Sequence, residues 1–93
     1  MSKILNTYNR KNISFNKGKG SFLYGKNGKK YLDFVQGIAV NCLGHANDHL
    51  IKSIYKQSKK VWHVSNVFKI PEQEKLAKRL TQRTFADYVS FQN

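Results

Sequence analysis

Short apolar runs in the N-terminal half of the chain have the pattern of a β-hairpin. Residues 21–24 and 30–34 are apolar-aromatic runs on either side of an Asn27-Gly28 pair. Asn-Gly favours a tight hairpin because both central positions of a type I′ turn need a positive φ. The sequence therefore predicts an antiparallel hairpin with its turn at this pair.

The segments on either side of this hairpin are less regular. Residues 13–16 are predicted to form a short strand, and Lys-Gly-Lys-Gly at 17–20 predicts a turn or bulge. Residues 35–45 are largely apolar but follow neither the period of a strand nor that of a helix. We expect a loop with extended pieces there.

Two helices are predicted in the C-terminal half. Asn47 or Asp48 can cap the first helix. The second begins at Pro71, with acidic residues in its first turn and Lys78, Arg79 and Arg83 near its end, which suits the helix dipole. The face of the first helix repeats at the helical spacing, through Leu50, Ile51, Ile54, Tyr55, Ser58, Val61 and Trp62.

Residues 88–92 have the composition of a strand. The expected order is therefore hairpin, loop, helix, helix, strand. This order is typical of the opening of an α/β fold whose main sheet begins near the last residues.

The length of 93 residues allows one small domain with a modest core. The net charge is +12, which alone suggests a polyanionic partner. However, 14 of the 17 basic residues are Lys and no basic run exceeds two residues, whereas contacts that read bases favour Arg. A small basic nucleic-acid-binding module is thus the weaker alternative.

The cysteine content and hydropathy bear on the compartment. Cys42 is the single cysteine, so no internal disulfide can form and a reducing, cytosolic setting fits. No stretch approaches 18 apolar residues, and the N-terminus has no apolar signal region. We expect neither a signal peptide nor a membrane span.

Three constellations could carry chemistry, and each has a simpler interpretation. The Lys-Gly-Lys-Gly stretch lacks the spacing of a phosphate-binding loop and no helix follows it, so a solvated turn is expected. As a nucleophile Cys42 would need an orienting group that the sequence does not supply, so we expect a small packed residue. The third constellation matches no known zinc-finger spacing, so we expect no metal site there; it consists of Cys42, His45, His49 and His63.

An aromatic-polar cluster lies between the two predicted helices. Aromatic rings among cations can stack on bases, or they can line a pocket for a planar cofactor or a small substrate. The residues alone leave both possibilities open. The cluster consists of Trp62, His63, Ser65, Asn66 and Phe68.

Three stretches, in order, resemble the N-terminal part of the class III pyridoxal-phosphate-dependent aminotransferases, and within them the acetylornithine branch. They are KGKGSFLYGKNGKKYLDFVQGIAVNCLGHAN, VWHVSNVFKIPEQEKLAKRL and FADYVSFQN. The resemblance covers residues 12–93. It implies an α/β fold, the incomplete N-terminal segment of a fold-type I transferase. Residues 1–46 would be a segment with the hairpin and a substrate-mouth loop, and residues 47–93 two helices and the first strand of the large cofactor-binding domain.

The resemblance also implies a function. The family transfers an amino group, here between N-acetylornithine and 2-oxoglutarate in arginine biosynthesis, in a cytoplasmic homodimer that uses pyridoxal 5'-phosphate. Succinylornithine, 4-aminobutyrate and ornithine are alternative donors. In the family the cofactor-phosphate motif, the catalytic lysine and the carboxylate-binding arginine follow the position of Asn93. The chain alone is therefore expected to be inactive, without catalytic or cofactor-binding residues, and without a nucleic-acid or membrane partner.

The resemblance finally marks candidate site residues. Ile38 and Phe68 match positions that contact substrate, and Gly37, Val40, Ser65 and Asn66 match the vicinity of the active site. An aromatic residue stands at the position of Ile38 in ornithine aminotransferases, so isoleucine argues mildly against ornithine. Gly44 and His45 match a turn that we expect to be structural rather than catalytic.

Overall fold

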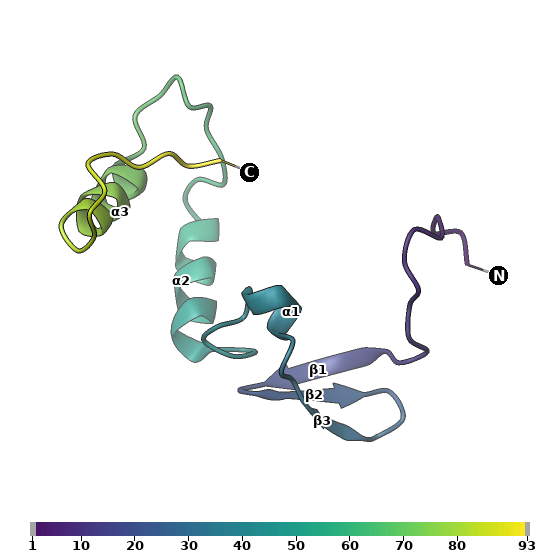
Figure 1. Ribbon diagram of the computed structural model, residues 1–93. Coiled ribbons are helices and arrows are strands. Elements are labelled where there is room, and N and C mark those ends of the chain that lie inside the picture. The colour runs from purple at the N-terminus through teal and green to yellow at the C-terminus, as the bar shows by residue number, and fades with distance from the viewer. Residues whose placement is uncertain (1, 93) are drawn as a thin grey trace. The chain divides into compact units, whose positions relative to one another are not determined.

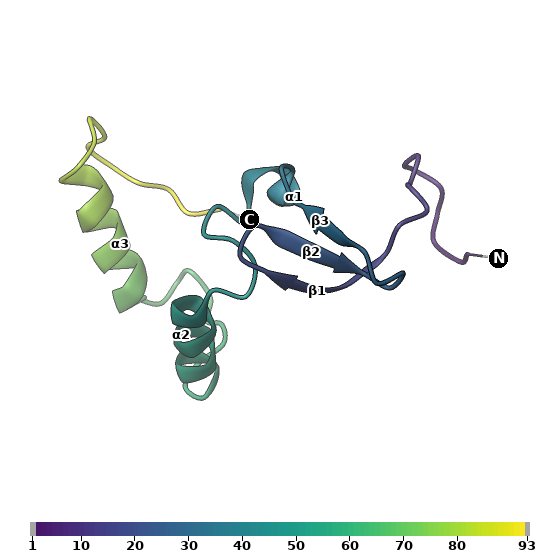
Figure 2. The same ribbon diagram turned by 90° about the horizontal axis from the view of Figure 1, so that it is seen from below.

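The computed structural model describes residues 2–92. Its first secondary-structure elements form a three-stranded antiparallel sheet. Its strands are β1 (Phe15–Lys19), β2 (Phe22–Gly25) and β3 (Lys30–Leu32), which lie side by side in the order β1-β2-β3 in both ribbon views (Figures 1 and 2). The sheet lies in the first of two units; the division falls between Lys56 and Gln57.

The predicted hairpin is confirmed as the β2–β3 pair, although its turn differs from the expected type. Leu23 pairs with Tyr31 at the centre of the register. Four residues connect the strands, and only Gly28 of the Asn-Gly pair has a positive φ, +76°. The Asn27 side chain explains the longer loop, because its Oδ1 accepts the Lys29 N–H (3.0 Å) and its Nδ2 donates to the Tyr31 hydroxyl (3.0 Å).

Strand β1 starts two residues later than predicted and includes most of the Lys-Gly-Lys-Gly stretch. A shift of register lies just before this stretch, between Phe15 and Lys17. The turn itself is confined to the connection after β1, where Gly20 has a φ of +56°. The polar strand pairs through its backbone, which leaves little side-chain pattern for a sequence-based prediction.

The two predicted helices are present, and both start where their signals place them. Helix α2 (Asp48–Ser58) is capped by Asn47, whose Oδ1 accepts the N–H groups of His49 (3.0 Å) and Leu50 (3.1 Å). Helix α3 (Pro71–Thr81) has Pro71 in its first turn.

Helix α2 ends earlier than predicted, whereas the basic residues expected near the end of α3 lie in or just after its last turn. The prediction carried α2 to Trp62, but the helix stops at Ser58, and the Trp62 indole N–H donates to the Ser58 carbonyl at 2.6 Å. Arg83 lies beyond the end of α3, where its N–H donates to Leu80 O at 3.1 Å.

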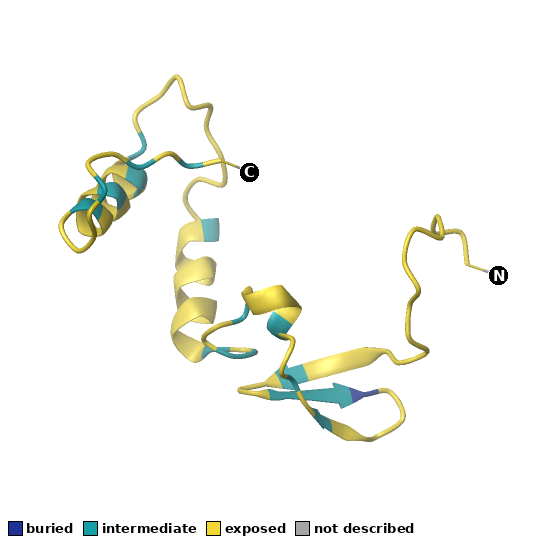
Figure 3. Ribbon diagram, in the orientation of Figure 1, coloured by how far each residue is buried: buried dark blue, intermediate teal, exposed yellow. Residues whose placement is uncertain are grey.

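None of the large apolar side chains within residues 2–92 is buried, and Gly25 is the one buried residue of that range (Figure 3). The apolar faces of both helices are open: Ile54 of α2 is 68% exposed and Leu76 of α3 is 46% exposed. Apolar faces of this extent normally pack against other structure.

The strand predicted at residues 88–92 is absent, so that prediction was wrong for this chain. A strand is defined by its ladder to a neighbour, and no partner pairs with these residues within the described part of the chain. Across residues 2–92, none of the helices has the length and apolar character needed to cross a membrane.

Candidate functional site

The segment that follows β3 forms a turn of left-handed helix, α1 (Gln36–Ala39), which the ribbon in Figure 2 shows continuing from β3. Its four φ angles are positive: 51° at Gln36, 64° at Gly37, 62° at Ile38 and 62° at Ala39. The predicted loop with extended pieces is therefore wrong for this stretch. The left-handed conformation costs L-residues roughly 1–2 kcal/mol each, so three non-glycine residues store roughly 3–6 kcal/mol. Ile38 is the least favourable of them because it is β-branched.

Backbone hydrogen bonds close α1 on itself. Val35 O accepts the N–H groups of Ile38 (2.9 Å) and Ala39 (3.2 Å), and Gln36 O accepts that of Asn41 (3.0 Å). The Ile38 side chain is left 87% exposed and that of Val40 76% exposed. The turn thus presents apolar side chains outward from a tight backbone.

Asp33 anchors the entry to α1. Its Oδ1 accepts the N–H groups of Val35 (3.1 Å) and Gln36 (2.8 Å), and its Oδ2 lies 2.6 Å from His45 Nε2. Since an ionised carboxylate only accepts, the proton of this last bond belongs to His45 Nε2. The Asp33 side chain is 8% exposed and that of His45 is 18% exposed, so the pair is largely shielded from water.

His45 in turn joins the loop to the edge of the sheet. Gly20 N–H donates to His45 O (2.9 Å) and His45 N–H donates to Gly20 O (2.8 Å). The backbones meet closely: a Cβ on Gly44, whose φ is +79°, would lie 3.0 Å from Gly20 C and O. A Cβ on Gly18 would lie 2.7 Å from His45 Cβ and Cγ. This arrangement agrees with the structural role expected for Gly44 and His45.

The same bonds give the Asp33 contact a defined pH dependence. The Gln36 N–H first, and then His45, hold the pKa of the Asp33 carboxyl below its ordinary value of 3.8. A lowered carboxyl pKa adds stability above the ordinary value and loses it as the pH falls through the lowered pKa. We expect amide exchange at Val35 and Gln36, corrected for its intrinsic pH dependence, to stay constant from neutral pH to about pH 4 and to accelerate below that. Hydrogen exchange with mass spectrometry measures this. Asp33→Asn is the control without this titration, and acceleration already above about pH 5 would contradict the assignment.

In the second unit, Ser65, Asn66 and Phe68 lie on one tight turn. Phe68 N–H donates to Ser65 O (3.0 Å), and Val67 N–H donates to Ser65 Oγ (3.4 Å). Phe68 is 65% exposed. The turn borders an open hollow of about 340 Å³, lined by His63, Val64, Asn66, Ile70, Gln73, Phe91 and Gln92.

The predicted site residues are thus grouped as two turns. Gly37, Ile38 and Val40 belong to or adjoin α1 in the first unit, and the other three share the Ser65–Phe68 turn in the second. Their roles toward a substrate remain predictions. Asp33 was missed by the sequence analysis. An Asp two and three residues before N–H groups at a chain reversal is a local signal that could have found its Oδ1 contacts.

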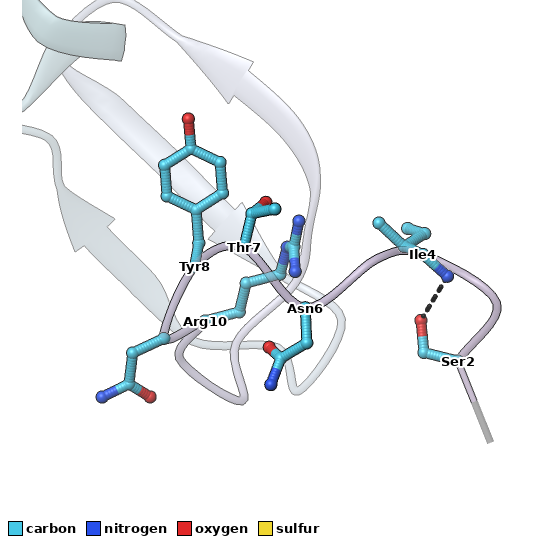
Figure 4. A pocket seen from close by; sticks show the side chains of 7 residues that line it. Ser2, Ile4, Asn6, Thr7, Tyr8 and Arg10 are labelled. Carbon is cyan, nitrogen blue, oxygen red and sulfur yellow. Dashed lines mark hydrogen bonds between the residues drawn. The ribbon is translucent and has the colours of Figure 1, made fainter.

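A hollow of about 630 Å³ lies on the N-terminal segment and offers no comparable chemistry (Figure 4). Its contacts are local: Ile4 N–H donates to Ser2 Oγ (3.2 Å), and the Arg10 guanidinium lies 5.6 Å from the centre of the Tyr8 ring. All of its lining residues belong to residues 2–10, so no second element shapes it.

The histidines and the cysteine do not assemble within residues 2–92. That range contains no group of three or more His, Cys, Asp or Glu side chains that could hold a metal ion. His45 is occupied by Asp33. Cys42 is exposed, so the expectation of a packed thiol was wrong for this chain.

Comparison with known proteins identifies the family to which the chain belongs. The family model for class III aminotransferases matches residues 5–93. The chain belongs to the class III aminotransferase family. It matches the N-terminal part of acetylornithine aminotransferases. It is 52% identical over 90 residues to the acetylornithine aminotransferase of Agrobacterium fabrum, covering 97% of this chain and 23% of that protein.

Two further proteins that are similar to this chain support the same family assignment. The acetylornithine aminotransferase of Rhodobacter capsulatus is 48% identical over 93 residues, which cover 100% of this chain and 24% of the relative. The crystal structure of N-acetylornithine aminotransferase from Stenotrophomonas maltophilia K279a superposes with a TM-score of 0.72 at 32% identity, over 81% of this chain and 21% of that chain. The α/β fold expected from the sequence is confirmed. The chain spans less than a quarter of the length of these relatives.

The family implies pyridoxal phosphate, but the described residues do not fit this cofactor. An imine-forming lysine is normally desolvated, whereas all 14 lysines of the chain are exposed. The Lys-Gly-Lys-Gly stretch does not form an anion cradle either, because Gly20 N–H is bound to His45 O and the space beside Gly18 is filled by the His45 side chain. The described residues therefore offer this cofactor neither an imine-forming lysine nor a phosphate cradle.

Proposed function

We propose that the chain is the N-terminal part of an enzyme that transfers an amino group between N-acetylornithine and 2-oxoglutarate in arginine biosynthesis. The observation that carries this proposal is the 52% identity over 97% of the chain to a protein named acetylornithine aminotransferase. Membership of the class III family supports pyridoxal phosphate as the cofactor of the whole protein. A cytoplasmic homodimer is part of the same proposal. The basic nucleic-acid-binding module has no support from these relatives.

Within this enzyme, Ile38 and Phe68 would contact the substrate. Ile38 is supported by its place on α1, where the side chain is exposed on a backbone held by hydrogen bonds. Phe68 is supported by its exposure on the Ser65–Phe68 turn. Gly37, Val40, Ser65 and Asn66 would lie near the substrate. The catalytic lysine, the cofactor-binding groups and the carboxylate-binding arginine would lie beyond Asn93.

The first test is to read the coding DNA past the codon for Asn93 and to assay the product of the complete reading frame. We expect N-acetylornithine and 2-oxoglutarate to give glutamate and an aldehyde product. Succinylornithine, 4-aminobutyrate and ornithine are assayed beside N-acetylornithine. A higher kcat/KM with one of these three would overturn N-acetylornithine as the proposed amino donor. A stop codon directly after Asn93 would overturn the proposal that the chain is part of an enzyme.

Ile38→Tyr tests the substrate contact in the same product. The larger ring at an exposed position of the substrate mouth should raise the KM for N-acetylornithine by about tenfold, because bulk there competes with the donor side chain. Steady-state kinetics measure this. Leu43→Tyr is the matched control, since Leu43 lies in the same loop, is 61% exposed and is assigned no contact. Equal KM values for the two variants would remove Ile38 from the substrate site.

A further inference from the structure

The Asp33 carboxylate connects the two ends of the loop between residues 33 and 45. Asp33 follows the last residue of β3, its Oδ1 accepts two N–H groups at the entry to α1, and its Oδ2 accepts from His45 at the far end of the loop. Both oxygens are used, and the side chain is 8% exposed. The loop is therefore closed at its base by a shielded hydrogen bond to a carboxylate.

The far end of this closure is itself fixed to the sheet. His45 exchanges two backbone hydrogen bonds with Gly20, and the missing Cβ of Gly44 allows the two backbones to approach. The hydrogen bonds to Gly20 fix the backbone that carries the imidazole. The imidazole in turn fixes the Asp33 carboxylate through the 2.6 Å contact. Without this contact the carboxylate would be held from one side only.

The near end determines where the left-handed conformation starts. Gln36 is the first residue of α1, with a φ of 51°, and its N–H makes the 2.8 Å bond to Asp33 Oδ1. An unfavourable backbone conformation persists where its surroundings hold it. Asp33 supplies such a hold at the first strained residue, two positions before Ile38.

We propose that Asp33 and His45 are positioning residues, whose pair holds α1 in the left-handed turn that presents Ile38 to the amino donor. The proposal rests on the proposed function for the identity of the molecule that Ile38 meets. The holding of α1 by the pair stands on the contacts alone. Neither residue is assigned a contact with substrate or cofactor.

A salt bridge elsewhere in the same unit serves as a matched comparison. Lys19 Nζ lies 3.4 Å from Asp48 Oδ1, with the two side chains 58% and 79% exposed. Exposed pairs of this kind contribute little, because water screens the charges and both side chains lose freedom. Asp48→Ala therefore removes a carboxylate and an ion pair from the unit without touching the loop.

The experiment compares four variants of the product of the complete reading frame: Asp33→Ala, His45→Ala, His45→Gln and Asp48→Ala. Hydrogen exchange reports on a peptide covering residues 34–44, and steady-state kinetics report on the reaction. Asp33→Ala and His45→Ala should speed exchange of this peptide and raise the KM for N-acetylornithine, each by about tenfold, with kcat changed less than about threefold. Gln carries an amide N–H that reaches the place of Nε2, so His45→Gln should restore most of both values. Asp48→Ala should match the wild type.

Each outcome decides a separate point. Wild-type exchange in Asp33→Ala overturns the proposal, and so does a fall in kcat and stability that His45→Gln shares with His45→Ala, since that would be a general packing role. Should Asp33→Ala fail to fold, the two His45 variants carry the same test. Lack of activity on N-acetylornithine in the wild-type product overturns the proposed function, while the exchange data still decide whether the pair holds α1.

Discussion

The isolated 93-residue chain should unfold without a cooperative transition. Ordering a backbone costs roughly 1–2 kcal/mol per residue, and the main compensation is the burial of apolar side chains, at roughly 1.5–3 kcal/mol for each fully buried one. No large apolar side chain within residues 2–92 is buried, so this compensation is missing. The sheet and helices of the isolated chain should melt gradually.

Circular dichroism during heating and during urea titration measures this expectation. The signal of the isolated chain should change without a sigmoidal step, whereas the product of the complete reading frame should show one. The isolated chain should also keep no pyridoxal phosphate absorbance after dialysis, since its described residues do not fit the cofactor. A sharp, denaturant-dependent step for the isolated monomer would show that 93 residues suffice for a folded domain.

Local signals account for the parts of the fold that were predicted from the sequence. Gly28 marks the hairpin, Asn47 caps α2 and Pro71 opens α3, and each acts through atoms within a few residues of itself. The ends were predicted less well. The apolar spacing continues to Trp62, but the indole N–H bonds back to Ser58 O and the chain has already left the helix. The strand at 88–92 needs a partner that the described residues do not provide.

The centre of the candidate site could not be predicted in the same way. Isoleucine and alanine disfavour the left-handed region, so no propensity points to α1 at Ile38 and Ala39. The turn is held by contacts that skip along the chain, from Asp33 to His45 and from His45 to Gly20. Ile38 was marked through its resemblance to a family, and the structure adds the strained backbone beneath it.

Gly44→Ala should cost far more stability than Gly28→Ala in the product of the complete reading frame. Both glycines have nearly the same φ, +79° and +76°, so each alanine adds roughly 1–2 kcal/mol of backbone strain. A Cβ on Gly28 meets nothing within 4 Å, whereas one on Gly44 would lie 3.0 Å from the Gly20 backbone, which overpacking data place at roughly 1–3 kcal/mol more. The difference in unfolding free energy between the two variants therefore measures the close approach of Gly44 to Gly20, beside the hydrogen bonds that hold His45.

Urea unfolding of the two variants and the wild type measures this difference. We expect Gly44→Ala to lower the free energy of unfolding by about 2–5 kcal/mol and Gly28→Ala by about 1–2 kcal/mol. Gly44→Ala should also speed exchange of the peptide covering residues 34–44, because a displaced His45 no longer reaches Asp33. Equal losses in both variants would mean that the close approach of Gly44 and Gly20 contributes nothing to stability, and the loop would then depend on the Asp33 contacts alone.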